Sequence, residues 1–294
     1  MLSQPTNRAQ PLTIAIAGAT GRVGSQLISQ LAQDPVTIRA LTRQKSSTAF
    51  PEGVASQELD FAEPSTLMKA LAGVDKLFIA HGSSPQQVAN EIALIDAAIE
   101  TGVRHIVKLS VMGPSTSINP FAWHSLIEAH LGQQSIASTV LRPTTFMDVL
   151  KRAGNAVATG TWAGAAGNGR VNLIDTRDVA ASARAALLEE VAAGSKHAYH
   201  LTGPGNWTMP QIAEALSDLL GHEVIYGHRS PAAQHYALVA NGLSPFVAEI
   251  LVGLDRIFHD SVLTERTFTV EDLTGNPPRS LTDWLRENID IFKK

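Results

Sequence analysis

A short apolar run that ends in three evenly spaced glycines constrains the fold of this chain more than any other feature. Residues 13–17 read as a buried strand, Gly18, Gly21 and Gly24 follow it, and a segment with one apolar helical face comes next. Gly18 permits a sharp turn, Gly21 lets a pyrophosphate approach the backbone, and Gly24 lets the helix pack closely on the sheet. This order predicts a strand, a tight turn and a helix that together bind a dinucleotide.

The helix that begins at Arg22 directs its free backbone N–H groups and its positive dipole end toward the turn. These groups favour a phosphate at that position, and a plain strand–helix turn without a ligand is the alternative. We therefore predict cofactor contacts from the residues of the turn: Gly18, Ala19, Thr20, Gly21, Arg22 and Val23.

The composition limits the classes of protein to which the chain can belong. It has 294 residues, 44% of them hydrophobic, and a net charge of −4 without a basic block, which argues against a nucleic-acid partner. The absence of cysteine excludes disulfides and thiolate chemistry. Residues 1–11 read as a flexible leader, not a signal peptide, and no run approaches the length of a membrane span. We expect a cytoplasmic protein with no membrane partner.

Strand-like and helix-like segments alternate along the first half of the chain. The short β-branched or apolar runs are separated by segments of helical periodicity, and the alternation predicts a Rossmann-type doubly wound parallel sheet of the α/β class. The predicted strands are residues 13–17, 36–42, 55–59, 75–80, 105–113 and 139–143. The helix after the fourth strand is expected to bury one stripe of residues: Val88, Ile92, Ile95 and Ile99.

The pattern changes after Phe146. Residues 154–169 are rich in Gly, Ala and Thr and predict a long connection. Beyond residue 208 the chain is predicted to be helical with short interruptions, preceded by strands at 170–174 and 197–201 and a helix at 177–190.

The end of the second predicted strand favours NADP(H) over NAD(H) as the cofactor. An NAD-specific site usually has an acidic residue about 20 residues after the glycines, and residues 41–44 contain none. Arg43 can bond a 2′-phosphate with two N–H groups, and Lys45 adds positive charge. A solvated arginine is the alternative. We predict a leader at 1–11, an NADP-binding domain at 12–150 and a smaller, mostly helical substrate-binding part at 151–294, interleaved with the first.

Loops after the other strands are expected to lie along the cofactor, because ligands of open α/β sheets bind outside the carboxyl ends of the strands. Asp60 would accept a hydrogen bond from the adenine and Phe61 would pack on it, with a turn or helix-start role for Asp60 as the alternative. Ala80, His81 and Gly82 follow the fourth strand, where His81 either touches the cofactor or fills the turn.

Seven parts of the sequence form a recognisable set: residues 18–24, Arg43, His124 with Glu128, and residues 141–147, 174–180, 201–204 and 273–279. Together they resemble the NmrA-like group of atypical short-chain dehydrogenases over nearly the whole chain. The resemblance implies an NADPH-dependent reductase that transfers hydride to a small flat acceptor, such as a quinone, an imine or iminium, or an activated alkene. The alternative is a non-catalytic NADP(H)-binding redox sensor of the NmrA type.

The helix after the fifth strand lacks the Tyr-x-x-x-Lys pair with which typical short-chain dehydrogenases transfer a proton. His124 and Glu128 stand in its place on one helix face. We expect the carboxylate to orient the imidazole and raise the pKa of His124, so that His124 donates a proton as hydride arrives. A structural His–Glu pair is the open alternative.

Residues at the ends of the fifth and sixth strands complete the predicted site. Ser110 could bond a substrate oxygen and is the third candidate catalytic residue beside His124 and Glu128, with a turn serine as the alternative. Ser110 is also expected at the cofactor, together with Pro143 and Thr144. The residues expected at the substrate, or alternatively in the core, are Met112, Trp123 and Phe146, with His124.

The ten histidines are scattered and form no metal-binding motif, so we predict no metal. A small-molecule substrate is the expected partner, and a homodimer is left open.

Overall fold

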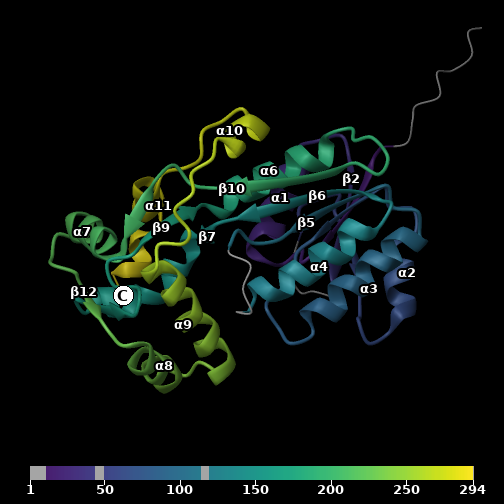
Figure 1. The fold of residues 1–294 in the computed structure, drawn as a ribbon. Coiled ribbons are helices and arrows are strands. Elements are labelled where there is room, and N and C mark those ends of the chain that lie inside the picture. The colour runs from purple at the N-terminus through teal and green to yellow at the C-terminus, as the bar shows by residue number, and fades with distance from the viewer. Residues whose placement is uncertain (1–10, 44–49, 114–118, 294) are drawn as a thin grey trace, which may run out of the picture.

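A seven-stranded, fully parallel sheet forms the centre of the larger part of the molecule (Figure 1). The structure, a computed structural model, describes residues 11–43, 50–113 and 119–293. The strand order β3-β2-β1-β4-β5-β6-β10 confirms the predicted doubly wound sheet. Its strands are β1 (Thr13–Ala17), β2 (Thr37–Thr42), β3 (Ala55–Glu58), β4 (Lys76–Ile79), β5 (His105–Leu109), β6 (Ala137–Pro143) and β10 (Lys196–Leu201).

Helices cover both faces of this sheet. The helices α1 (Arg22–Leu31) and α6 (Thr176–Leu188) pack on one face, and α2 (Pro64–Leu71), α3 (Gln87–Glu100) and α4 (Phe121–Gln133) pack on the other (Figure 1). The two apolar cores that result leave the carboxyl ends of the strands free of helices, and the site lies at that edge.

The buried face of α3 differs from the predicted one. Val88, Ile92 and Ile99 are only partly buried, whereas Gln87 and Glu91 are fully buried. Apolar periodicity could not indicate this face, because its two polar residues are buried only through partners on β5 and α4.

The C-terminal part has its own core and two small sheets. The prediction of a long connection at 154–169 is wrong, since a helix and a strand lie there. The part beyond residue 208 is mostly helical, as predicted, with one strand, at 225–228, among its helices, and a further strand at 206–208 directly before it was not predicted. Each of these strands pairs with a segment distant in sequence, which local periodicity cannot reveal. The sheets contain β7 (Thr145–Phe146), β9 (Arg170–Ile174) and β11 (Asn206–Thr208), and β8 (Thr161–Gly164) with β12 (Ile225–His228).

Helices surround these small sheets, and α9 faces the larger part of the molecule (Figure 1). They are η1 (Met147–Ala153), α5 (Gly154–Ala158), α7 (Met209–Leu220), α8 (Pro231–Ala240), α9 (Pro245–His259), α10 (Thr269–Thr274), α11 (Leu281–Glu287) and η2 (Ile289–Phe292).

The chain crosses between the two parts more than once, because α6 and β10 follow segments of the C-terminal part and belong to the seven-stranded sheet and its helices. The domain limits at residues 12, 150 and 294 remain predictions. Of the predicted leader at 1–11 only residue 11 is among the described residues, and Lys45 lies outside them. In the described ranges, no helix has both the length and the apolar character needed to cross a bilayer.

Candidate active site

The glycine turn follows β1, beside β4, at the point where the strand order reverses. Gly18 has φ +83°, and a Cβ placed on it would lie 2.3 Å from the Ala80 carbonyl oxygen. A Cβ on Gly24 would lie 2.2 Å from the Gly18 carbonyl oxygen, so packing requires both glycines. A Cβ on Gly21 would meet only that same oxygen, at 3.1 Å. The outer surface of the turn at Gly21 is therefore bare backbone.

The amino terminus of α1 has the features of an anion site. Its N-cap residue, Gly21, provides no side-chain hydrogen bond, and the first turn holds no acidic residue. The free N–H groups and the helix dipole therefore act together at this end. The side chains of Ala19 and Val23 are buried in the core, so these two residues can meet a ligand only through their backbone.

A cavity of about 370 Å³ extends from the turn across the ends of β2 and β4. Eight residues predicted to contact the cofactor line it: Gly18, Thr20, Gly21, Arg43, Phe61, Ala80, His81 and Gly82. Ser83 and Ser84 belong to the same loop as His81 and also line the cavity, whereas sequence reasoning missed other lining residues, among them Thr42 and Glu91.

Two of these residues present side chains suited to an adenosine phosphate. Arg43 is exposed at the end of β2 and has no ion-pair partner within the described ranges. The rings of Phe61 and His81 lie 5.7 Å apart between centroids and form one wall. Asp60 lies outside the lining, because its Oδ1 accepts a hydrogen bond of 2.9 Å from the Ala62 N–H in a turn.

A smaller cavity, of about 170 Å³, lies at the ends of β5 and β6 against α9, and its surface is almost entirely apolar. Met112 and Phe146 were predicted at the substrate and Pro143 and Thr144 at the cofactor, and all four line it. The remaining lining residues were missed: Val111, Pro120, Phe121, Thr145, Ile250, Leu254 and Leu263. Those from α9 lie about 100 residues further along the chain, so no local signal could reveal them.

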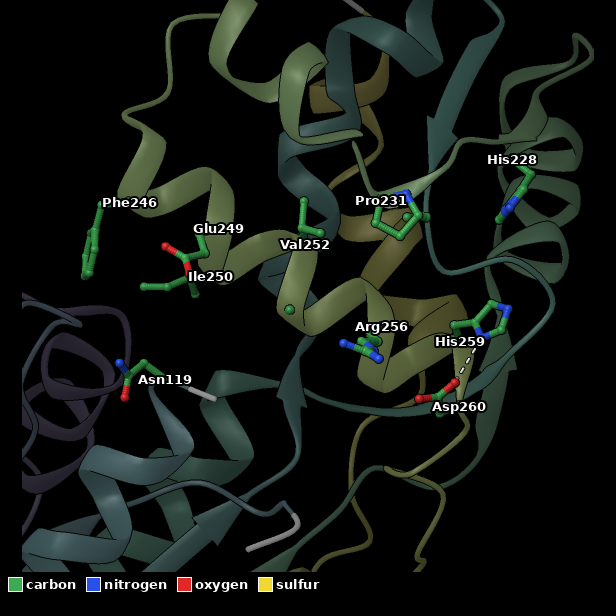
Figure 2. A pocket seen from close by; sticks show the side chains of 12 residues that line it. Asn119, His228, Pro231, Phe246, Glu249, Ile250, Val252, Arg256, His259 and Asp260 are labelled. Atoms are coloured by element: carbon green, nitrogen blue, oxygen red, sulfur yellow. Dashed lines mark hydrogen bonds and ion pairs between the residues drawn. The ribbon is translucent and has the colours of Figure 1, made fainter. Parts of the chain in front are cut away.

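An open hollow of about 890 Å³ continues along α9 from Ile250, which lines both spaces. Figure 2 shows Phe246 and Asn119 at one end of this hollow, and Arg256 with His259 toward the other. The predicted substrate contact Trp123 lines neither space; its ring stacks on Phe246 at 6.1 Å and supports the wall.

Glu128 pairs with partners other than the predicted one. The Ser110 hydroxyl donates to Glu128 Oε1, and Arg142 Nε donates to both carboxylate oxygens at 3.2 and 3.1 Å. The hydrogen bonds and charge of Glu128 raise the pKa of Arg142. The described contacts of Glu128 do not include His124, so the expected His–Glu pair does not form.

His124 lies instead beside a buried cation. Lys108 Nζ is 3.1 Å from His124 Nδ1 and 2.8 Å from Glu91 Oε2. Burial, together with the nearby charges of Lys108 and His81, lowers the pKa of His124 to about 2. The prediction that Glu128 raises the pKa of His124 is therefore wrong, and His124 is a neutral imidazole at physiological pH.

Within the residues described, no three His, Asp or Glu side chains are grouped so that they could hold a metal ion. The polar groups at the carboxyl edge form two separate clusters, one around Glu128 and one around Lys108.

A doubly wound parallel sheet with a glycine turn at its switch point defines a Rossmann-type dinucleotide-binding protein. The chain belongs to the NmrA-like family, which it matches over residues 10–252. The predicted resemblance is thereby confirmed.

The similar proteins match over nearly their full length. NAD(P)H azoreductase of Xenophilus azovorans is 30% identical, over 95% of this chain and 99% of the relative. Quinone oxidoreductase 2 of Escherichia coli is 31% identical, over 92% and 96%. The crystal structure of that NADPH-dependent enzyme with NADPH covers 94% of this chain and 99% of its own, with a TM-score of 0.85 and 28% identity. Triphenylmethane reductase of Citrobacter sp., complexed with NADP(H), has a TM-score of 0.84 and 25% identity, over 94% and 99%.

Proposed function

We propose that this protein is an NADPH-dependent reductase that transfers hydride to a small, flat, largely apolar acceptor. The names of its relatives support NAD(P)H-dependent reduction, since they are an azoreductase, a quinone oxidoreductase and a triphenylmethane reductase. One observation in this chain carries the choice of acceptor. An apolar cavity lies at the same edge of the sheet as the glycine-turn cavity, between β6 and α9.

The residues at the glycine turn fit NADPH. The bare backbone at Gly21 and the uncapped amino terminus of α1 can receive the pyrophosphate. The exposed guanidinium of Arg43 can bond the 2′-phosphate, and Phe61 with His81 can pack on the adenine. NADPH, when bound, supplies the hydride.

The residues around the smaller cavity hold the acceptor and exclude water. Met112, Phe121 and Phe146 offer apolar and aromatic surface to a flat ring system, and α9 closes the other side with Ile250 and Leu254. This enclosure keeps the acceptor in place while hydride arrives, so proximity is a large part of the catalysis. Ser110 remains a predicted contact at this edge, with its hydroxyl oriented by Glu128.

The experiment that tests the function is NADPH oxidation in the presence of quinones, triarylmethane dyes, imines and enones. We expect one class to respond, with product formed in proportion to the NADPH consumed. NADPH binding without oxidation by any class would contradict the reductase.

NADPH binding without oxidation would describe a redox sensor, and one observation favours this second candidate function. The chain has no Tyr-x-x-x-Lys pair, and the neutral His124 cannot serve as a strong acid in its place. A sensor would bind NADPH and NADP⁺ with different affinities and would change its contacts with a partner protein accordingly.

A further inference from the structure

Four polar side chains from three elements meet behind the cofactor cavity. They are Gln87 and Glu91 of α3, Lys108 of β5 and His124 of α4. The side chains of Lys108 and Glu91 are 0% and 1% exposed, and Gln87 is also fully buried. A charged pair buried to this degree is costly unless its hydrogen bonds are satisfied, so the bonding of each atom is informative.

The bonds of Lys108 determine where the proton of His124 lies. The ammonium group has three N–H donors, and its three neighbours are Glu91 Oε2, the Leu109 carbonyl oxygen at 2.5 Å and His124 Nδ1. An ammonium group can only donate, so Nδ1 must accept and carries no proton. The single proton of the neutral imidazole is therefore on Nε2.

The Nε2–H group of His124 has no acceptor within the described residues. It contacts Gln87 Nε2, at 3.4 Å, which is itself a donor. Exchanging the oxygen and nitrogen of the Gln87 amide would supply an acceptor. It would also place that oxygen 2.9 Å from Glu91 Oε1, where the amide now donates. The hydrogen bond to Glu91 thus fixes the orientation of the Gln87 amide, and the Nε2–H group of His124 is left without an acceptor among the described residues.

His124 lines neither cavity, but residues next to it do: Phe121, one turn earlier on α4, lines the apolar cavity, and Gln87, 3.4 Å from His124 Nε2, leads to the cofactor cavity. Glu91 lines that cavity, and Gln87 is the first residue of α3, directly after the loop that contains Ser83 and Ser84 of the lining. A donor without an internal partner at this edge suits an acceptor atom that arrives with a ligand.

We propose that Lys108, held by Glu91, is a positioning residue that fixes His124 as the neutral Nε2–H tautomer and so presents one hydrogen-bond donor to the substrate. This deepens the proposed function and rests on it for the identity of the acceptor atom. The substrate is then a molecule with an oxygen or nitrogen at the end of its reducible bond, as in a quinone carbonyl, an azo group or an imine. Negative charge develops on that atom as hydride arrives, and the hydrogen bond strengthens accordingly.

The charges around His124 keep this tautomer over a wide pH range. Lys108 faces it from β5, His81 from the loop after β4, and Glu91 from α3 behind Lys108. Glu128 on its own helix is bonded to Arg142 and does not offset these charges. His124 should therefore not titrate between about pH 5 and 9.

Nitrogen-15 NMR of histidine-labelled protein tests the tautomer directly, with the His124 signals assigned from a His124→Gln sample. We expect an unprotonated Nδ1 and a protonated Nε2, both unchanged from pH 5 to 9. A protonated Nδ1 or an imidazolium signal in that range would overturn the proposal. Because this measurement needs no turnover, it is independent of the acceptor panel and separates failure of the tautomer from failure of the reductase.

The variant Lys108→Met tests the positioning role, with Lys76→Met as its matched control. Lys76 is also buried, but it lies at the opposite edge of the sheet and bonds the Glu189 carbonyl oxygen. In Lys108→Met we expect His124 to titrate nearer its ordinary pKa and turnover to fall at least tenfold, with NADPH affinity within twofold. Lys76→Met should change none of these. Unchanged His124 signals in Lys108→Met would refute the role. If Lys108→Met does not fold, the wild-type spectrum and Glu91→Gln, which removes the countercharge that holds Lys108, decide the question.

Discussion

Glu128 lies one helical turn beyond His124 on α4, yet its carboxylate bonds Arg142 and Ser110. The reason is geometric and electrostatic. Arg142 extends from β6 beneath the helix and offers two N–H groups to one carboxylate, and His124 is already held by Lys108. The two residues that the sequence pairs by spacing therefore belong to two separate networks.

Replacing Glu128 by Gln should weaken the fold without altering His124. The half-buried Arg142 would lose its countercharge, so we expect the free energy of unfolding to fall by about 1–3 kcal/mol. Urea denaturation at pH 7 measures this change, and Asp96→Asn, which breaks the exposed pair with His130, should cost less than about 1 kcal/mol. A change in the His124 NMR signals of Glu128→Gln would contradict this separation and support the contact between His124 and Glu128 that their spacing suggests.

Arg43 should account for most of the preference for NADPH over NADH. Replacing it by Gln removes the charged donors for the 2′-phosphate, so we expect the NADPH dissociation constant to rise about 10- to 100-fold. The NADH dissociation constant, which involves no 2′-phosphate, is the internal control and should change less than about twofold. Calorimetric titration gives both values, and an equal loss for the two cofactors would contradict the assignment.

The sequence predicted the parts of this molecule whose structure depends on neighbouring residues in the chain. It did not predict the features that depend on contacts with residues distant in the sequence. The strand, turn and helix at residues 13–31 follow from spacing alone, because Gly18 and Gly24 are required by atoms within this unit or in the neighbouring strand. The buried Gln87 and Glu91 could not be predicted, because a polar residue on a helix is buried only if a partner such as Lys108 meets it there. The contribution of α9 to the apolar cavity was missed for the same reason.

Alanine substitutions at two glycines of the turn should have different effects, one on the free energy of unfolding and the other on NADPH binding. Gly18→Ala adds a Cβ at positive φ against the Ala80 carbonyl, so we expect a loss of about 2–4 kcal/mol in unfolding free energy. Gly21→Ala should cost less than about 1 kcal/mol, because its Cβ meets only the Gly18 oxygen at 3.1 Å, but it should weaken NADPH binding at least tenfold. Thermal unfolding with and without NADPH measures both effects. Unimpaired binding by a folded Gly21→Ala would argue against a pyrophosphate at this turn.

Acid should destabilise the protein through two buried histidines. Burial lowers the pKa of His124 to about 2 and that of His105 to about 4, whereas each has a pKa of 6.5 when unfolded. Below pH 6.5 the unfolded chain takes up protons that the folded chain does not, so stability is complete above that pH and is lost as the pH falls. Each histidine should cost about 2 kcal/mol between pH 7 and 5.

Urea denaturation at these two pH values checks this dependence. His124→Gln should remove about half of the extra loss at pH 5, and the exposed His222→Gln should remove none. Equal stability of the wild type at both pH values would show that the buried imidazoles take up protons in the folded state.

Ile250 should control access to the apolar cavity. It lines both this cavity and the open hollow along α9, so a tryptophan there would occupy much of a space of about 170 Å³. We expect Ile250→Trp to lower kcat/KM for a two-ring quinone at least tenfold, with less effect on benzoquinone and none on NADPH affinity. The next residue, Leu251, lines a different cavity behind α9, so Leu251→Trp is the matched control and should leave the ratio of the two quinones unchanged. Steady-state kinetics with both quinones decide the matter, and an equal loss for both would place the acceptor elsewhere.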